Sequence, residues 1–355
     1  MKRALLILGA LTAAAWAQEA SSGFELQVTA SACADLSNQL TEYPRDGAPV
    51  AAGFHLIAYP TWKIDRHWSV TAAVQAYSRP YFYSDLSTQG YGLNASLLQA
   101  SVNYSTFWKN NSLVLRAGEL PTAFGSFLLR YDDFVNPLVD MPLGYGYAWA
   151  YDGVTLDPVG AAEADLTLGH ADFRAQLTNT SPANPHSIFS HTQNGGWAGG
   201  AGYTIRQGFR VGVSAFRGPY LDDDDTQGLE NARLLPATAL GLDVEWGHGP
   251  WNVNAELQRF QFPNDIAPGT VPRYGYAEVR RTLGPRWYIA ARASGRRQDS
   301  WTNEQVWETA LGFRPGAHQL IKFDYERVQL AWGEPVNVLA VQFVTTSRPI
   351  SIARD

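Results

Sequence analysis

The sequence predicts an all-β fold, a transmembrane antiparallel β-barrel of about 16 strands. Three observations predict it. The N-terminus has the pattern of an export signal, and the composition is rich in aromatic residues and glycine without a membrane-spanning apolar run. Apolar and polar residues also alternate with a period of two along most of the chain. These features are typical of exported barrels that cross a membrane with strands.

The N-terminus indicates export. Lys2 and Arg3 form a short basic segment, and residues 5–16 are apolar but too short to span a bilayer. Ala15-Trp16-Ala17 places small residues at the positions that signal peptidase reads. We therefore expect residues 1–17 to be a signal peptide and residues 18–355 to be a single domain, with strands between about 23 and 347.

Composition narrows the class of protein. The formal net charge is -6, and an acidic chain argues against nucleic acid as a partner. The single cysteine, Cys33, excludes an intramolecular disulfide framework. No spacing of Cys, His or Gly predicts a metal site or a cofactor, and no catalytic spacing appears among His and Ser. Phe, Trp and Tyr make up 13% of the residues, with 12 Trp and 32 Gly, which favours a membrane barrel.

Strict alternation marks the strands. In residues 251–258, Trp251, Val253, Ala255 and Leu257 fall on one face, while asparagine, glutamate and glutamine residues fall on the other. A soluble core would not leave a charged face on nearly every strand, whereas a water-filled lumen would. The predicted strands are about 23–33, 51–63, 67–79, 93–107, 111–120, 161–169, 172–180, 196–206, 208–217, 236–247, 250–262, 272–283, 286–298, 304–314, 317–330 and 336–347.

Connections between these strands are alternately short and long, as in outer-membrane barrels with short periplasmic turns and longer external loops. If the short connections are periplasmic, this alternation gives an even number of strands, with both termini in the periplasm. Aromatic residues with outward parity gather at the short turns, where indole and phenyl rings can form a girdle at the membrane interface. The girdle residues are Trp62, Trp68, Trp108, Trp246, Trp251, Trp287, Phe313 and Phe343.

The segment from Arg116 to Gly125, RAGELPTAFG, resembles the strand-to-loop entry of bacterial outer-membrane porin-type barrels. The resemblance is one of architecture and covers nearly all of the mature chain. It implies a pore in the bacterial outer membrane, with lipid, lipopolysaccharide and the barrel-insertion machinery as partners, and a homotrimer by analogy. One departure is at the C-terminus, because about a dozen residues follow the aromatic Phe343, where such barrels usually end on an aromatic residue.

The resemblance also implies that the third external loop, about 121–160, folds into the barrel and forms the constriction. A loop of this length is usually functional, and the alternative is a cover over the outer mouth. We expect its carboxylates to face inward-pointing arginines across a narrow gap. The predicted constriction residues are Arg130, Asp132, Asp133, Asp140, Arg79 and Arg116.

Inward parity predicts further charged residues along the lumen. They are Glu163, Asp165, Arg174, Asp243, Glu245, Glu256, Glu278, Arg280, Arg292, Arg296, Lys322, Asp324 and Glu326. Rings of charge set the sign preference of a pore. Because acidic residues modestly exceed basic ones among the inward positions, we expect passive diffusion of small hydrophilic solutes with a weak preference for cations.

Other functions stay open at this point. Phe216, Phe260, Tyr274 and Tyr276 have inward parity and could form a track for sugars, although such rings more often pack loops. An anion-selective channel is another alternative, because the chain has arginines that could line its path, although lysine is scarce. The run Asp222 to Asp225 could bind Ca²⁺ or could be a solvated loop tip. A barrel-embedded hydrolase and an adhesion or scaffold barrel are the remaining alternatives.

Overall fold

The structure is a computed structural model, and it describes residues 22–38, 50–79, 92–145, 158–179, 195–219, 236–262, 271–298, 302–329 and 333–353. Three regions named above lie outside the described residues: the signal peptide 1–17, the run Asp222 to Asp225, and residues 146–157 of the long loop. Among the described residues, no helix has both the length and the apolar character needed to span a bilayer.

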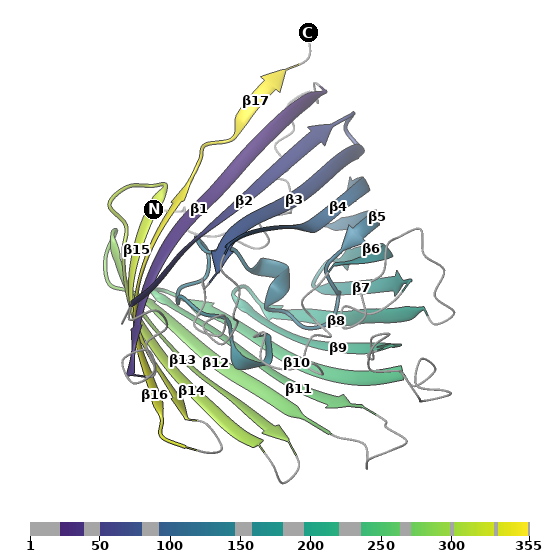
Figure 1. The fold of residues 1–355 in the computed structure, drawn as a ribbon. Helices are drawn as coiled ribbons and strands as arrows, with labels where there is room; N and C mark the ends of the chain where they lie inside the picture. Colours follow the sequence, from purple (N-terminus) through teal and green to yellow (C-terminus); the bar gives the residue numbers. More distant parts are fainter. Residues whose placement is uncertain are drawn as a thin grey trace.

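Strands account for nearly all of the regular structure (Figure 1). Their bounds are β1 Gly23–Ser37, β2 Val50–Lys63, β3 Trp68–Arg79, β4 Gly92–Trp108, β5 Asn111–Leu120, β6 Val159–Leu168, β7 Ala171–Thr178, β8 Gly196–Arg206, β9 Phe209–Pro219, β10 Pro236–His248, β11 Trp251–Gln261, β12 Arg273–Thr282, β13 Trp287–Gln298, β14 Thr302–Phe313, β15 Gln319–Gln329, β16 Val336–Thr346 and β17 Ile350–Ala353.

Each strand from β1 to β16 pairs antiparallel with its sequence neighbours, and the sheet closes on itself. β1 pairs with β2 on one side, with Gln27 opposite Tyr59, and with β16 on the other, with Cys33 opposite Gln342. A closed sheet leaves no unpaired edge in the bilayer, which is the condition for spanning it with strands. The predicted barrel of about 16 antiparallel strands is therefore confirmed.

The chain after Phe343 forms a strand that the alternation did not predict. β17 continues the line of β16 and pairs with the start of β1, with Ile352 opposite Phe24 (Figure 1, yellow beside purple). The two pieces are separated around Pro349, whose ring nitrogen cannot donate to a strand neighbour. The C-terminal tail thus extends the wall past the aromatic residue.

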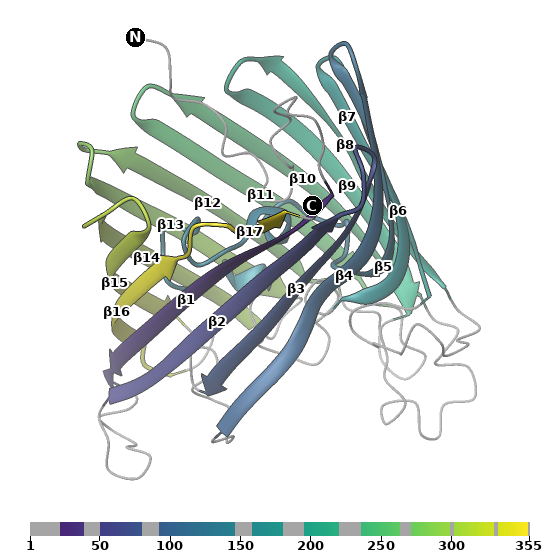
Figure 2. The same ribbon diagram turned by 90° about the horizontal axis from the view of Figure 1, so that it is seen from above.

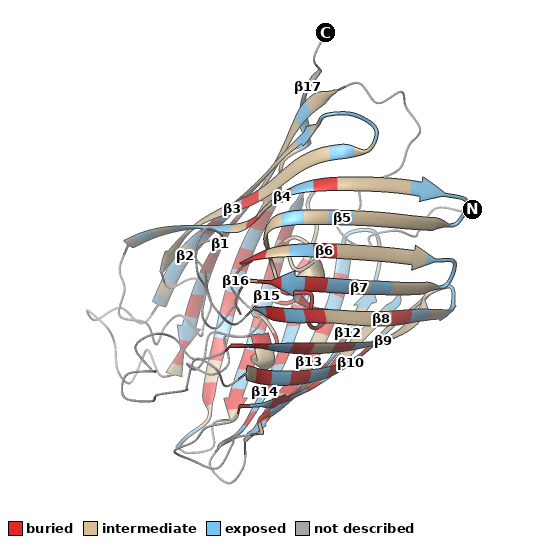
Figure 3. Cartoon of the chain, turned by 90° about the vertical axis from the view of Figure 1, so that its right-hand side faces the viewer, coloured by how far each residue is buried: buried red, intermediate tan, exposed pale blue. Residues whose placement is uncertain are grey.

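Burial alternates along the strands in the opposite sense to a soluble protein (Figure 3). On β10, the outward side chains of Leu240 and Leu242 are 63% and 57% exposed, while the inward side chain of Asp243 on the same strand is only 7% exposed. Apolar side chains therefore cover the outside of the barrel and polar ones its inside. Figure 2 shows the same wall from above, with the coiled segment that follows β5 enclosed by the strands.

Candidate channel interior

The first half of the long loop, residues 121–145, lies within the barrel and is called here the inner segment (Figures 1 and 2). It contains two short 3-10 turns, Leu128–Arg130 and Leu143–Tyr145. Gly125 lets the chain turn into the lumen, since its φ is +79° and a Cβ there would collide with the Tyr145 hydroxyl and the Glu256 carboxylate. Only glycine fits this crowded, left-handed position.

Inward side chains of β7, β9 and β11 bind the two ends of the inner segment. Glu256 on β11 accepts hydrogen bonds from the Ser126 amide at 3.2 Å, from the Ser126 hydroxyl at 3.1 Å and from the Tyr145 hydroxyl at 2.7 Å. The amide of Gly125 donates to Ser214 Oγ at 3.2 Å, and that of Ala123 donates to Gln176 Oε1 at 3.0 Å. A single buried carboxylate thus bridges residues that are nearly twenty positions apart in the segment.

Aromatic packing seals the same region. Phe124 contacts Phe260 with ring centroids 5.4 Å apart and Phe216 with centroids 6.4 Å apart. Tyr274 and Tyr276 are 5% and 6% exposed, and Tyr276 packs against Phe127. The four rings weighed above as a sugar track are therefore buried beneath the inner segment, so they pack the loop and offer no open face for stacking.

Asp132 and Asp133 attach the inner segment to β1 and β2. The Tyr59 hydroxyl donates to Asp132 Oδ2 at 2.5 Å, and His55 Nδ1 lies 2.8 Å from Asp133 Oδ2. Asp133 also accepts hydrogen bonds from the Ser31 hydroxyl and from Tyr131. It is 1% exposed. This differs from the sequence-based expectation of carboxylates open to the gap, because inward donors on β2 draw them onto the wall.

A second group of charged side chains fixes the middle of the inner segment to β13, β14 and β15. Lys322 Nζ donates to the carbonyls of Asp133 at 2.7 Å and Leu138 at 2.8 Å. Arg292 Nη2 donates to the carbonyl of Asp140 at 2.5 Å and also pairs with Glu308. These cations are 0% and 3% exposed. They satisfy backbone carbonyls that have no strand partner.

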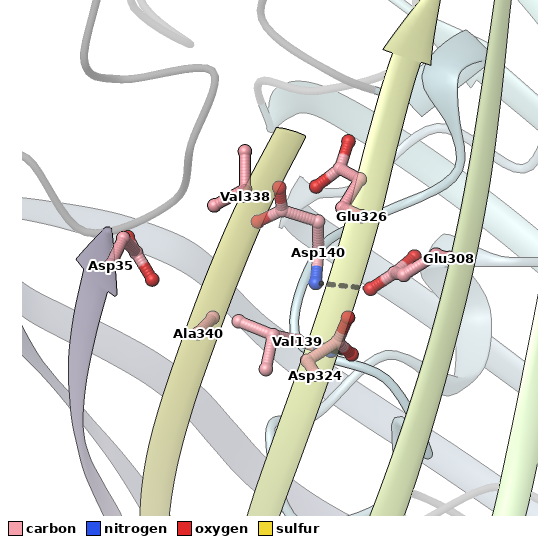
Figure 4. Close-up of a pocket in the computed structure, with 8 residues that line it drawn as sticks. All are labelled: Asp35, Val139, Asp140, Glu308, Asp324, Glu326, Val338 and Ala340. Carbon is pink, nitrogen blue, oxygen red and sulfur yellow. Dashed lines mark hydrogen bonds between the residues drawn. The ribbon is translucent and has the colours of Figure 1, made fainter. Parts of the chain in front are cut away.

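Carboxylates surround the segment at this attachment. Figure 4 shows those of Asp35, Asp140, Glu308, Asp324 and Glu326 around one small pocket, with the Asp140 amide donating to Glu308 at 3.1 Å. The Val139 amide donates to Asp324 Oδ2, also at 3.1 Å. Among the described residues, no group of three or more His, Cys, Asp or Glu is placed to hold a metal ion. The pocket is acidic and lies beside Arg292 and Lys322.

The wall from β5 to β10 carries ion pairs that stay partly open. Arg116 pairs with Glu163 and Asp165, and Arg174 Nε lies 2.6 Å from Asp165. On β9, Arg210 lies 2.6 Å from Asp172 of β7 and 2.7 Å from Asp243 of β10. The exposed fraction is 28% for the Arg174 side chain and 39% for that of Asp172. The absence of a side chain at Gly202 makes room for the Arg210 guanidinium, which a Cβ there would meet.

The structure brings together some of the predicted site residues but not all. Arg116 faces Glu163 and Asp165 on its own wall, not the carboxylates of the inner segment. The side chains of Arg79 and Arg130 lie outside the described residues. Glu278 lies 3.4 Å from Arg292, and Arg296 lies 3.9 Å from Glu304, while Glu245 and Arg280 are half-buried at inward positions.

Sequence reasoning did not single out His55, Tyr59 or Tyr145, because uncharged or weakly charged inward residues carry no distinguishing pattern.

The eight aromatic residues predicted as a girdle all lie beside the short turns. Trp62 and Trp68 are both 45% exposed, and the ring of Trp287 packs against that of Phe313 in a tilted arrangement with centroids 4.4 Å apart. Phe343 is 42% exposed, and Trp246 and Phe313 are half-buried. Their placement at one rim is a structural finding, while their contact with lipid remains a prediction.

Comparison with known proteins gives a likeness of fold. No family model matches the chain, and no curated protein matches it. Among solved structures, an anion-selective porin from Comamonas acidovorans is 11% identical, with a TM-score of 0.63 over 92% of this chain and 100% of that one. OmpF of Salmonella typhi in complex with daunomycin is 10% identical, with a TM-score of 0.62 over 91% and 97%. OmpT of Vibrio cholerae, in trimer form, is 7% identical, with a TM-score of 0.59 over 92% and 100%.

These likenesses and the closed wall of β1–β16 define the class of structure. The chain has the porin-type fold, a 16-stranded antiparallel β-barrel. At identities of 7–11%, the likeness concerns the fold alone.

Proposed function

We propose that this chain is an outer-membrane porin, a passive diffusion channel for small hydrophilic solutes with a weak preference for cations. The observation that carries the proposal is the closed 16-stranded wall with a polar, ion-paired inner face. A barrel of this strand number is wide enough to leave an aqueous lumen. Export through the predicted signal peptide and the porin-type fold support the bacterial outer membrane as its location.

The inner segment is the proposed constriction. Its hydrogen bonds run to β1, β2, β7, β9, β11, β13, β14 and β15. Arg116, Arg174 and Arg210, which lie on β5, β7 and β9 closer to the short turns, stay partly exposed. We infer that solutes pass beside the inner segment and along the part of the β5–β10 wall that carries these three arginines. The ion pairs of that wall would then supply the field that a permeating ion meets.

The sign of the selectivity follows from charge. Along the open wall, Arg116, Arg174 and Arg210 face four carboxylates: Glu163, Asp165, Asp172 and Asp243. The open wall therefore has one carboxylate more than it has arginines, and such an excess favours cations in a confined lumen. One structural neighbour is described as anion-selective, so the likeness itself does not fix the sign.

The proposal is tested by reconstituting the protein in planar bilayers and measuring reversal potentials under a salt gradient. Replacing Asp165 and Asp172 by Asn should lower the cation-to-anion permeability ratio, because two open carboxylates of the wall lose their charge. The control replaces Asp65, in a short turn, and Glu334, in a connection, by Asn and Gln; both are exposed. Equal ratios for the two double variants would contradict the charge assignment, and a wild type without conductance would contradict the channel.

Other parts of the proposal concern partners. Small hydrophilic solutes, outer-membrane lipid and the barrel-insertion machinery are the partners expected of such a channel, and no enzymatic activity is proposed. A homotrimer is the proposed assembly, supported by the porin-type fold and by a neighbour whose structure is described as a trimer. The wall of β6 and β7 is the candidate interface between copies.

A further inference from the structure

Three arginines stand in one row on the outside of the barrel. Arg259 on β11 is directly opposite Arg273 on β12, and Arg273 is directly opposite Arg297 on β13. All three side chains are exposed. Directly opposed residues in an antiparallel pair have Cα atoms about 4.5–5.5 Å apart, so three like charges lie side by side on neighbouring strands.

This arrangement is unfavourable in the isolated chain. Like charges directly opposite one another destabilise a sheet. Among the described residues, no carboxylate forms a salt bridge with Arg259, Arg273 or Arg297. The outward positions of β10–β15 hold no Asp or Glu within the part of the chain that the structure describes. Within the described part of this face, no carboxylate offsets the three positive charges.

The row lies near the rim of the barrel that carries the long connections. Arg273 begins β12, and Arg259 and Arg297 are close to the ends of their strands, on the side of the long connections. Two further outward arginines mark the same rim, each directly opposite an exposed tryptophan: Arg217 opposite Trp197 and Arg327 opposite Trp307. Tryptophan prefers the interface between hydrocarbon and water, and an arginine there costs little.

We propose that the row of Arg259, Arg273 and Arg297 binds the phosphate groups of an anionic glycolipid of the outer leaflet, a lipid of the lipopolysaccharide class. Guanidinium groups bind phosphate oxygens through paired hydrogen bonds, which lysine cannot do. Phosphates between the arginines would turn the repulsion into attraction, while the acyl chains would lie along Leu257 and the apolar wall below. The inference rests on the proposed outer-membrane location, with the long connections outside.

The test measures binding of purified lipopolysaccharide to the refolded full chain in detergent, by native mass spectrometry or immobilised-protein titration. The triple variant Arg259→Gln, Arg273→Gln, Arg297→Gln should bind about tenfold or more weakly. The matched control is Arg206→Gln, Arg281→Gln, Arg286→Gln, which removes three exposed arginines near the short turns. The control should bind like the wild type, and lipopolysaccharide stripped of its phosphates should bind weakly to every form.

Equal binding by the triple variant and the wild type would overturn the proposal, and so would equal binding of the stripped lipid. If inorganic phosphate at micromolar concentration displaced the lipid, the row would be a site for free phosphate and the assignment to a lipid would fail. Heat-dependent migration on gels reports whether each barrel is folded. Conductance is measured separately, so a failed lipid site with normal conductance would leave the channel proposal standing.

Discussion

Charged residues with the same inward parity have two different environments in this barrel. Arg292 is 3% exposed and binds Glu278, Glu308 and the carbonyl of Asp140 at once. Arg174, on the open wall, keeps 28% of its side chain exposed and pairs with Asp165. A fully enclosed cation needs several partners to offset its lost hydration, whereas a part-exposed one is still hydrated. The first kind positions the inner segment, and the second kind faces the proposed path.

Asp133 gives a prediction at the residue scale. Asp133→Ala removes the acceptor of His55, Ser31 and Tyr131. Leaving buried donors without a partner costs about 1–3 kcal/mol, and we expect that loss in the attachment of the inner segment, not in the barrel wall. The variant should show noisier single-channel current and faster proteolytic cleavage within residues 121–145, with unchanged barrel migration on gels.

A matched change on the open wall separates attachment from simple loss of charge. Asp172→Ala removes a carboxylate that is 39% exposed and bound to Arg210. It should leave current noise and cleavage as in the wild type. If the two variants behave alike, the buried contacts of Asp133 do not hold the segment in place.

Among the elements, the inner segment depends on one backbone turn. Gly125→Val places a branched side chain at a φ of +79° and against the Tyr145 hydroxyl and Glu256. We expect the first turn of the segment to leave its site between Ser214 and Glu256, so that single-channel conductance changes by about twofold or more while the strands still form. Gly284→Val, in a short turn with open space around it, is the control and should conduct normally. Identical conductance in both variants would show that this turn does not shape the pore.

The strands could be predicted from sequence, whereas the contacts of the inner segment could not. Period-two alternation is local, so it places Lys322 and Asp324 inward without any knowledge of the rest of the chain. Their partners, Leu138 and Val139, are more than 180 positions away, and nothing in the local pattern of either element encodes the contact. β17 was missed for a local reason, because Pro349 interrupts the alternation that would have extended β16.

For the whole molecule, the wall of β6 and β7 differs from the rest. β7 has eight residues, fewer than any other strand from β1 to β16. Ala164, Ala175 and Gly199 lie in one row across β6, β7 and β8, so the outer surface there is flat. Leu177 beside them is 69% exposed. Small residues let two walls approach closely in a bilayer, where packing drives association. This strip is the proposed contact between copies in the homotrimer.

The assembly is tested by placing a bulky charge in that strip. Ala175→Arg should dissociate the proposed trimer in mild detergent, because the long side chain separates the flat surfaces and carries its charge into the contact. Ala277→Arg on β12 is the matched control, since Ala277 is also an exposed, outward alanine in mid-strand. Both changes carry the same cost of about 2–4 kcal/mol for an arginine facing lipid, so only the contact distinguishes them. Mass measurement in detergent should give a monomer for the first variant and a trimer for the control. A wild-type monomer would remove the proposed assembly, and a trimer for both variants would move the interface to another part of the wall.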